Sequence, residues 1–185
     1  MPGRREVELA MHGDHDAFAS LAAASGDRLF SLARMILRDG DRAEDATQEA
    51  LVKAWRELPR LRDPDRFDAW LRRLLVNACY DEARRVTRRA EVRSLPVAHP
   101  LGDEPSHAVA NRDRVDRGLR RIPIEQRAVL VLHHHLGLTH VEIAATLGLP
   151  LGTVKSRLRY AVEAMRAAIE ADDRGVEPVA EGRTA

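Results

Sequence analysis

A stretch without hydrophobic periodicity divides this chain into two helical blocks. It runs from Ser94 to Ala110, reads SLPVAHPLGDEPSHAVA and contains three prolines. Apolar residues recur at helical spacing before it, from Asp16 onward, and again after it, from Arg112 to about Ile169. Because proline lacks an amide hydrogen and fixes its φ angle, the stretch interrupts any continuous helix. The pattern predicts two small helical domains joined by a flexible linker.

The composition agrees with an all-α fold class. Aromatic residues make up 4% of the 185 residues, and Ala, Leu and Arg dominate, which favours helices over strands. We place the domains at 16–90 and 112–170, with the linker at 91–111. Residues 1–15 are predicted to be a flexible N-terminus, and the polar residues 171–185 a disordered tail.

Bulk properties exclude several classes of protein. Thirty Lys and Arg face 29 Asp and Glu, so the net charge of +1 gives no sign of nucleic-acid binding, and any basic surface must come from local segregation. Cys79 is the only cysteine, which excludes an intramolecular disulfide and a multi-cysteine metal cluster. No apolar run approaches the roughly 20 residues that span a bilayer, and the first residues lack the apolar segment of a signal peptide. We expect a soluble cytoplasmic protein without membrane insertion.

The first block predicts helices near 16–37, 41–57 and 65–88, with a proline-bracketed loop between the second and the third. The third helix carries two faces. One is apolar and contains Phe67, Trp70, Leu71, Leu74 and Ala78. The other is polar and contains Arg73, Asn77, Tyr80 and Arg84, spaced four, three and four residues apart.

The second block predicts helices at 112–120 and 124–135, followed by a helix-turn-helix. Thr139 and Glu142 form a capping box at the start of its first helix. Gly148 suits the left-handed position of the turn, and Gly152 opens the second helix. The buried face of the first helix is expected to hold Val141, Ile143, Ala144 and Leu147. A recognition helix needs short polar or basic residues in its first turns, and Thr153, Lys155, Ser156, Arg157 and Arg159 meet that need.

Two segments carry a resemblance to a known family. EDATQEALVKAW and FDAWLRRLLVNACYDEARR resemble regions 2.2 to 2.4 of extracytoplasmic-function (ECF) sigma factors, in the sigma-70 family of RNA polymerase. IPIEQRAVLVLHHHLGLTHVEIAATLGLPLGTVKSRL resembles region 4 of the same group, in the expected order. The resemblance implies a region 2 helical bundle and a region 4 helix-turn-helix, and a protein that directs DNA-templated transcription initiation without any catalytic residue, cofactor or metal.

The resemblance also implies partners and the residues that meet them. The partners are core RNA polymerase, through the coiled coil of its largest subunit and its flap, promoter DNA, and an anti-sigma factor. Polymerase binding falls to Asp45, Gln48, Glu49 and Lys53. The minus-10 promoter element would meet Arg73, Asn77, Tyr80, Arg84 and Arg85, beside a base pocket formed largely by the loop 59–66. The minus-35 element would meet Thr153, Lys155, Ser156, Arg157 and Arg159.

Other residues are expected to be structural. Trp55 and Trp70 are assigned to the core, and Cys79 is expected to be half-buried. His133, His134 and His135 depart from the family pattern, and no carboxylate or cysteine stands at ligand spacing, so no metal site is expected. Two other functions remain open: a helix-turn-helix regulator that acts without polymerase, and a His-dependent metal hydrolase.

Overall fold

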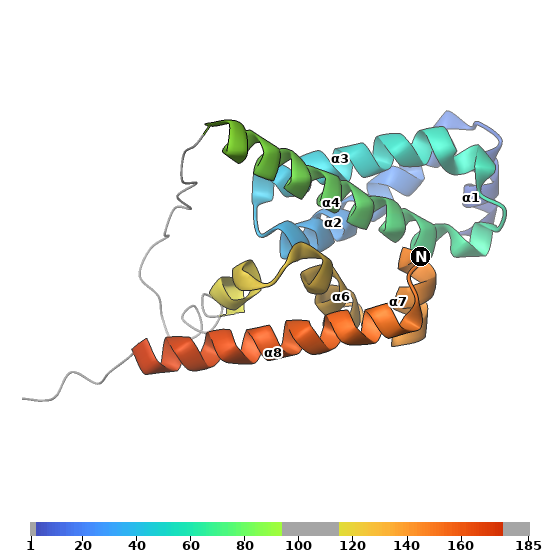
Figure 1. Cartoon of the computed structure of the whole chain (residues 1–185). Coiled ribbons are helices and arrows are strands. Elements are labelled where there is room, and N and C mark those ends of the chain that lie inside the picture. Colours follow the sequence, from blue (N-terminus) through green and yellow to red (C-terminus); the bar gives the residue numbers. More distant parts are fainter. Residues whose placement is uncertain (1–2, 94–114, 176–185) are drawn as a thin grey trace, which may run out of the picture.

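The structure is a computed structural model, and it describes the backbone of residues 3–93 and 115–175. Within those ranges every regular element is a helix (Figure 1). The two predicted helical units are present, and the chain between them lies outside the described residues. The all-α prediction is confirmed.

The first unit consists of four α-helices and two short 3-10 helices. The elements in chain order are α1 (Arg4–Met11), α2 (His15–Leu37), α3 (Gly40–Glu57), η1 (Leu58–Arg60), η2 (Pro64–Arg66) and α4 (Phe67–Arg93). Carboxylates start two of the helices, since Asp14 accepts a hydrogen bond from the Ala17 amide and Asp39 accepts one from the Arg42 amide. The three helices predicted from the sequence are confirmed within a few residues, although α4 continues into the predicted linker.

The prediction of a flexible N-terminus is wrong, because residues 4–11 form α1. Val7 and Ala10 stand three residues apart on one face of this helix and are 2% and 1% exposed. They contribute to the main core, and Met11 packs against it. The apolar stripe spans two turns among charged residues, which is too short to stand out in a periodicity search.

The second unit contains a helix over 115–121, then α6 (Ile124–His134), α7 (His140–Leu147) and α8 (Leu151–Gly175). The capping box is confirmed, because the Thr139 hydroxyl accepts from the Glu142 amide while the Glu142 carboxylate accepts from the Thr139 amide. Gly148 adopts the left-handed conformation at φ 66°. Helix α8 also continues past residue 170, through the first residues of the predicted tail.

Two burial predictions are corrected. Val141 is 65% exposed, whereas Ile143 is fully buried. Residues two apart on a helix point about 200° away from each other, so these two could not share a face. Cys79 is completely buried rather than half-buried, because it lies on the side of α4 that faces α2.

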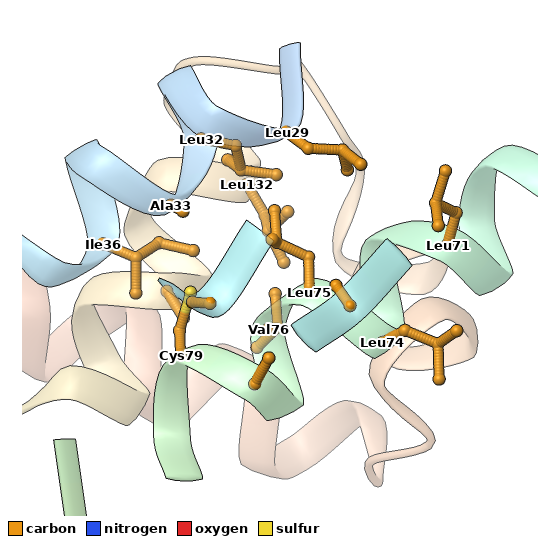
Figure 2. Packing of buried hydrophobic residues seen from close by; sticks show 14 of the residues in the cluster. Leu29, Leu32, Ala33, Ile36, Leu71, Leu74, Leu75, Val76, Cys79 and Leu132 are labelled. Atoms are coloured by element: carbon orange, nitrogen blue, oxygen red, sulfur yellow. The ribbon is translucent and has the colours of Figure 1, made fainter. Parts of the chain in front are cut away.

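One hydrophobic core runs through both units. In Figure 2, Leu132 of α6 lies among Leu29 and Leu32 of α2 and Leu75 of α4. Val129, Ile143 and Val154 of the second unit belong to the same buried cluster. A smaller cluster inside the second unit comprises Leu119, Ile122, Leu130 and Ala161. The two predicted domains are therefore packed against each other in this structure.

Candidate promoter and polymerase interface

The outer face of α3 collects the residues predicted to bind polymerase. Asp45, Gln48 and Glu49 are exposed, and Lys53 is partly exposed on the same helix. The opposite side of α3 is lined with small buried residues, namely Ala43, Ala46, Thr47, Ala50 and Ala54. These small side chains let α3 pack closely on its neighbours, which leaves its polar side free for a partner. Val52 is 47% exposed on α3 and adds apolar surface to this helix, which the sequence analysis did not predict.

The predicted minus-10 residues lie along α4, on a side that the second unit partly covers near Gly148 and Arg157. Arg73, Asn77 and Arg84 are exposed, while Tyr80 is partly buried. Burial raises the pKa of Tyr80 to about 12, although the nearby Arg157 guanidinium acts in the opposite direction. The Tyr80 hydroxyl is buried and has no hydrogen-bond partner among the described residues.

Two of the α4 arginines are held by carboxylates one turn earlier. Arg84 lies 3.8 Å from Asp81, and Arg85 lies 3.3 Å from Glu82, whose side chain is 8% exposed. The Arg84–Asp81 pair is exposed and therefore weak, so the Arg84 guanidinium can be released to a phosphate oxygen at little cost. Glu82 is buried, so removing Arg85 from it would leave a buried carboxylate without its partner.

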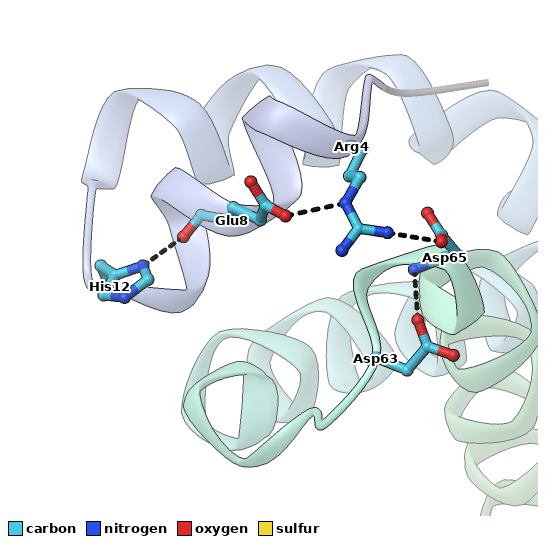
Figure 3. Close-up of polar contacts among 5 residues, drawn as sticks. All are labelled: Arg4, Glu8, His12, Asp63 and Asp65. Atoms are coloured by element: carbon cyan, nitrogen blue, oxygen red, sulfur yellow. Dashed lines mark hydrogen bonds and ion pairs between the residues drawn. The ribbon is translucent and has the colours of Figure 1, made fainter.

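The loop predicted to form the base pocket is braced by α1. Figure 3 shows Arg4 donating to Asp65 of η2 at 2.5 Å and to Glu8 of its own helix at 2.8 Å. Asp63 accepts a hydrogen bond from the Asp65 amide at 3.0 Å and so caps η2. Leu58 of η1 is fully buried. The loop is thus anchored at its start by a core residue and at its far end by α1.

A groove of about 420 Å³ lies beside this loop. One wall belongs to the first unit and consists of Leu61, Arg66, Ala69, Trp70, Arg72 and Arg73. The other wall belongs to the helix-turn-helix and consists of Leu138, Glu142, Ala145 and Thr146. Three arginines therefore face one carboxylate. The charge favours an anion, and Trp70 offers a ring on which a base can stack.

The residues predicted to read the minus-35 element occupy the first turns of α8. Lys155 and Arg159 are exposed, whereas Thr153, Ser156 and Arg157 are partly covered. The Ser156 hydroxyl donates to the Thr153 carbonyl at 3.0 Å. Arg159 lies over the Tyr160 ring, 4.8 Å from its centroid, and 3.8 Å from Glu163. The first turns of α8 carry the mixture of short polar and basic side chains that suits a major groove.

The histidines form ring contacts. His133 stacks on His140, with ring centroids 5.1 Å apart, and its Nδ1 atom lies 2.7 Å from the Leu138 carbonyl oxygen. Among the residues that the structure describes, no three His, Cys, Asp or Glu side chains are grouped so as to hold a metal ion. The arrangement gives no support to a metal hydrolase.

The backbone over 3–93 and 115–175 also holds no helix of the length and apolarity needed to cross a membrane.

Comparison with known proteins agrees with the residue chemistry. Residues 21–89 match Sigma-70 region 2, and residues 112–165 match Sigma-70, region 4. The chain is 36% identical over 157 residues to the ECF RNA polymerase sigma factor SigM of Mycobacterium tuberculosis (strain H37Rv), covering 83% of this chain and 79% of SigM. It is 28% identical over 178 residues to the ECF RNA polymerase sigma factor SigW of Bacillus subtilis, covering 88% of this chain and 94% of SigW.

Solved structures show the same fold. CnrH in complex with the cytosolic domain of CnrY aligns with a TM-score of 0.67 at 29% identity, over 93% of this chain and 99% of that chain. The sigma factor RpoE of Bartonella quintana, in complex with the anti-sigma factor NepR, aligns with a TM-score of 0.68 at 24% identity, over 84% of this chain and 98% of that chain. Regions 2 and 4 are both present in order, and the chain belongs to the sigma-70 family as an ECF RNA polymerase sigma factor.

Proposed function

We propose that this sigma factor divides promoter recognition between its two units. Helix α3 docks on core RNA polymerase, α4 with the loop 59–66 opens and holds the minus-10 element, and α8 reads the minus-35 element. The observation that carries the proposal is the arginine-lined groove beside the braced loop, with Asn77 exposed on the adjoining face of α4.

The chemistry of each face suits its task. Strand opening requires an unstacked base to be caught by stacking and by hydrogen bonds to its edge. Trp70 lines the groove, and Asn77 offers an amide that both donates and accepts. Sequence-specific binding to duplex requires side chains that reach base edges, and Lys155 and Arg157 lie in the first turns of α8.

The experiment separates the two readers within one polymerase complex. Asn77→Ala should impair strand opening, measured by permanganate reactivity of unpaired thymines, while duplex binding at the minus-35 element persists. Arg157→Ala should weaken binding to minus-35 duplex by about 1–3 kcal/mol if it contacts a base edge. Arg121→Ala, an exposed arginine outside both faces, is the matched control and should change neither property. If the Asn77→Ala variant opened the promoter strands normally, the assignment of α4 to the minus-10 element would be wrong.

We also propose that a separate anti-sigma factor restrains this protein in the cytoplasm. CnrH and RpoE, which share its fold, were each solved with a bound partner, and the partner of RpoE is an anti-sigma factor. Purification from the native host under non-inducing conditions should yield a one-to-one complex with an inhibitory protein. Recovery only as an active free chain, or only with polymerase, would point to control by synthesis or degradation.

A further inference from the structure

Another arginine-lined pocket lies where α2 ends and α3 begins. Its volume is about 220 Å³, and it shares no lining residue with the groove beside the loop 59–66. Its walls come from the α2–α3 junction, from α4 and from the segment 120–127. The charged residues that line it are four arginines and one aspartate, namely Arg38, Arg42, Arg120, Arg127 and Asp39. None of these arginines belongs to the faces assigned to promoter or polymerase.

The carboxylates around this pocket balance only part of its positive charge. Asp39 lies 3.2 Å from Arg42 and also caps α3. Asp116 pairs with Arg38 and lies 4.0 Å from Arg120. Within the described parts of the chain, four guanidinium groups are therefore paired with two carboxylates. The pocket keeps an excess of positive charge that favours an anion.

The most buried of the four arginines is held by carbonyl groups instead of a carboxylate. Arg127 is 9% exposed, and its Nη1 and Nη2 atoms donate to the Ile36 and Ile122 carbonyl oxygens at 2.7 and 2.8 Å. Its Nε atom is buried without a hydrogen-bond partner among the described residues, and so is the Nε atom of Arg38. Because a buried N–H group without an acceptor is destabilising, both groups indicate an oxygen acceptor supplied by a ligand.

The guanidinium groups also repel one another across the pocket. Burial lowers the pKa of Arg127 to about 10, and the neighbouring Arg38 and Arg120 act in the same direction. The pKa of Arg38 is lowered by its burial and again by Arg120. Arg127 remains charged at neutral pH, so the repulsion persists there. A bound anion would relieve it at several arginines together.

Size and charge together indicate a diphosphate group. Ordinary ligand pockets occupy roughly 300–1,000 Å³, so a volume of about 220 Å³ suits the phosphate groups of a ligand and leaves any attached nucleoside outside. The planar guanidinium group of arginine binds phosphate oxygens in pairs. Two linked phosphate groups can offer such oxygens to all four arginines at once.

We propose that this pocket binds a diphosphate group, as inorganic pyrophosphate or as part of a nucleoside diphosphate, through Arg38, Arg42, Arg120 and Arg127. The site goes beyond the proposed function, because it lies apart from the surfaces assigned to promoter and polymerase. A ligand that binds the folded chain and not the unfolded one also stabilises it.

Isothermal titration calorimetry of the full chain with inorganic pyrophosphate tests the site. We expect one molecule bound per chain. Arg42→Ala and Arg120→Ala should each weaken binding by about tenfold or more, the usual effect of losing a charge-assisted hydrogen bond. Arg121→Ala removes an exposed arginine that does not line the pocket, and this control should bind pyrophosphate as the wild type does.

Thermal unfolding provides a second readout and shows that the variants fold. The Arg42 and Arg120 side chains are 27% and 39% exposed, so we expect their removal to leave a cooperative transition. Pyrophosphate should raise the midpoint of the wild type and of Arg121→Ala. At the same concentration it should raise the midpoint of Arg42→Ala and Arg120→Ala less.

Titrations with ADP and with promoter duplex distinguish the possible occupants. ADP binding no tighter than pyrophosphate supports a site for the diphosphate group alone, and tighter ADP binding supports the same site with an added nucleoside contact. Duplex DNA is the competing occupant, because Ala83 and Thr87 of the pocket also border a more open hollow that contains Arg84. If Arg120→Ala weakens duplex binding while neither small anion binds, the pocket serves promoter phosphates and the proposal is wrong.

Two further results would overturn the proposal. One is pyrophosphate binding that Arg42→Ala and Arg120→Ala leave unchanged, or no binding by the wild type. The other is binding that disappears in Arg73→Ala and persists in Arg120→Ala, since the anion would then lie in the minus-10 groove. These results leave the proposed function untouched, because that function is measured with core polymerase and promoter DNA.

Discussion

Leu75 lies at the junction of the two units and shows how single side chains hold the molecule together. It is fully buried on α4, and in Figure 2 it lies near Leu132 of α6 and Leu29 of α2. Removing its branched end leaves a cavity that rigid helices on either side cannot fill.

At this scale we predict that Leu75→Ala lowers the free energy of unfolding by about 2–5 kcal/mol, the range for large-to-small changes in a packed core. Urea denaturation followed by circular dichroism measures the change. The matched control is Leu9→Ala, since Leu9 is 46% exposed on α1 and should change stability by less than about 0.5 kcal/mol. Equal effects at the two positions would show that Leu75 is not part of a shared core.

The spacing of apolar residues along a helix predicted the burial of some single residues but not of others. Phe67, Leu71 and Leu74 were assigned to the buried face of α4 and are buried. Cys79 was placed too near the surface because α4 is covered on more than one side, by α2 and α3 and also by α6. Coverage by a second unit cannot be deduced from the periodicity of one helix.

The turn of the helix-turn-helix depends on one backbone conformation. Gly148 has φ 66°, a left-handed conformation that residues with a side chain rarely adopt. It stands directly after the last residue of α7. An added Cβ atom would approach the flexible end of Arg73, which can move aside, so the cost comes from the backbone.

At the scale of this element we predict that Gly148→Ala destabilises the protein by about 1–2 kcal/mol, the cost of a left-handed L-residue. Gly152→Ala is the control, because Gly152 lies in α8 with no atom within 4 Å of the added Cβ. It should not destabilise the protein, because alanine favours helix formation more than glycine does. Thermal unfolding of both variants measures the direction of each stability change. If Gly152→Ala lost as much stability as Gly148→Ala, the left-handed backbone at Gly148 would not explain the loss.

Helices whose ends carry specific capping residues were predicted well, whereas the short helix α1 was missed. Thr139, Glu142 and Gly148 mark α7 so specifically that its bounds followed from three residues. Helix α1 has no side-chain cap, and its polar residues outnumber its buried ones. It is stabilised by packing on its neighbours, an interaction that local sequence does not reveal.

The whole molecule joins two recognisable units in an arrangement that the sequence did not predict. A net charge of +1 conceals a local excess of arginine in the groove between α4 and α7. The predicted site residues on α3, α4 and α8 fall on separate faces, and the second and third of these faces approach each other where Arg157 meets Tyr80. Arg120 and Arg127 were not identified as functional, since the pocket that they line is assembled from segments far apart in sequence.

As a whole, the molecule is proposed to give core RNA polymerase its promoter specificity. The direct test is transcription in vitro from fragments of the host genome by core polymerase, with and without the purified chain, followed by sequencing of RNA 5′ ends. We predict discrete start sites that appear only with the chain and share motifs at minus 10 and minus 35, whereas the chain alone binds the same duplexes weakly. Tight, specific binding by the free chain, together with no new start sites when core polymerase is added, would exclude this role for the chain.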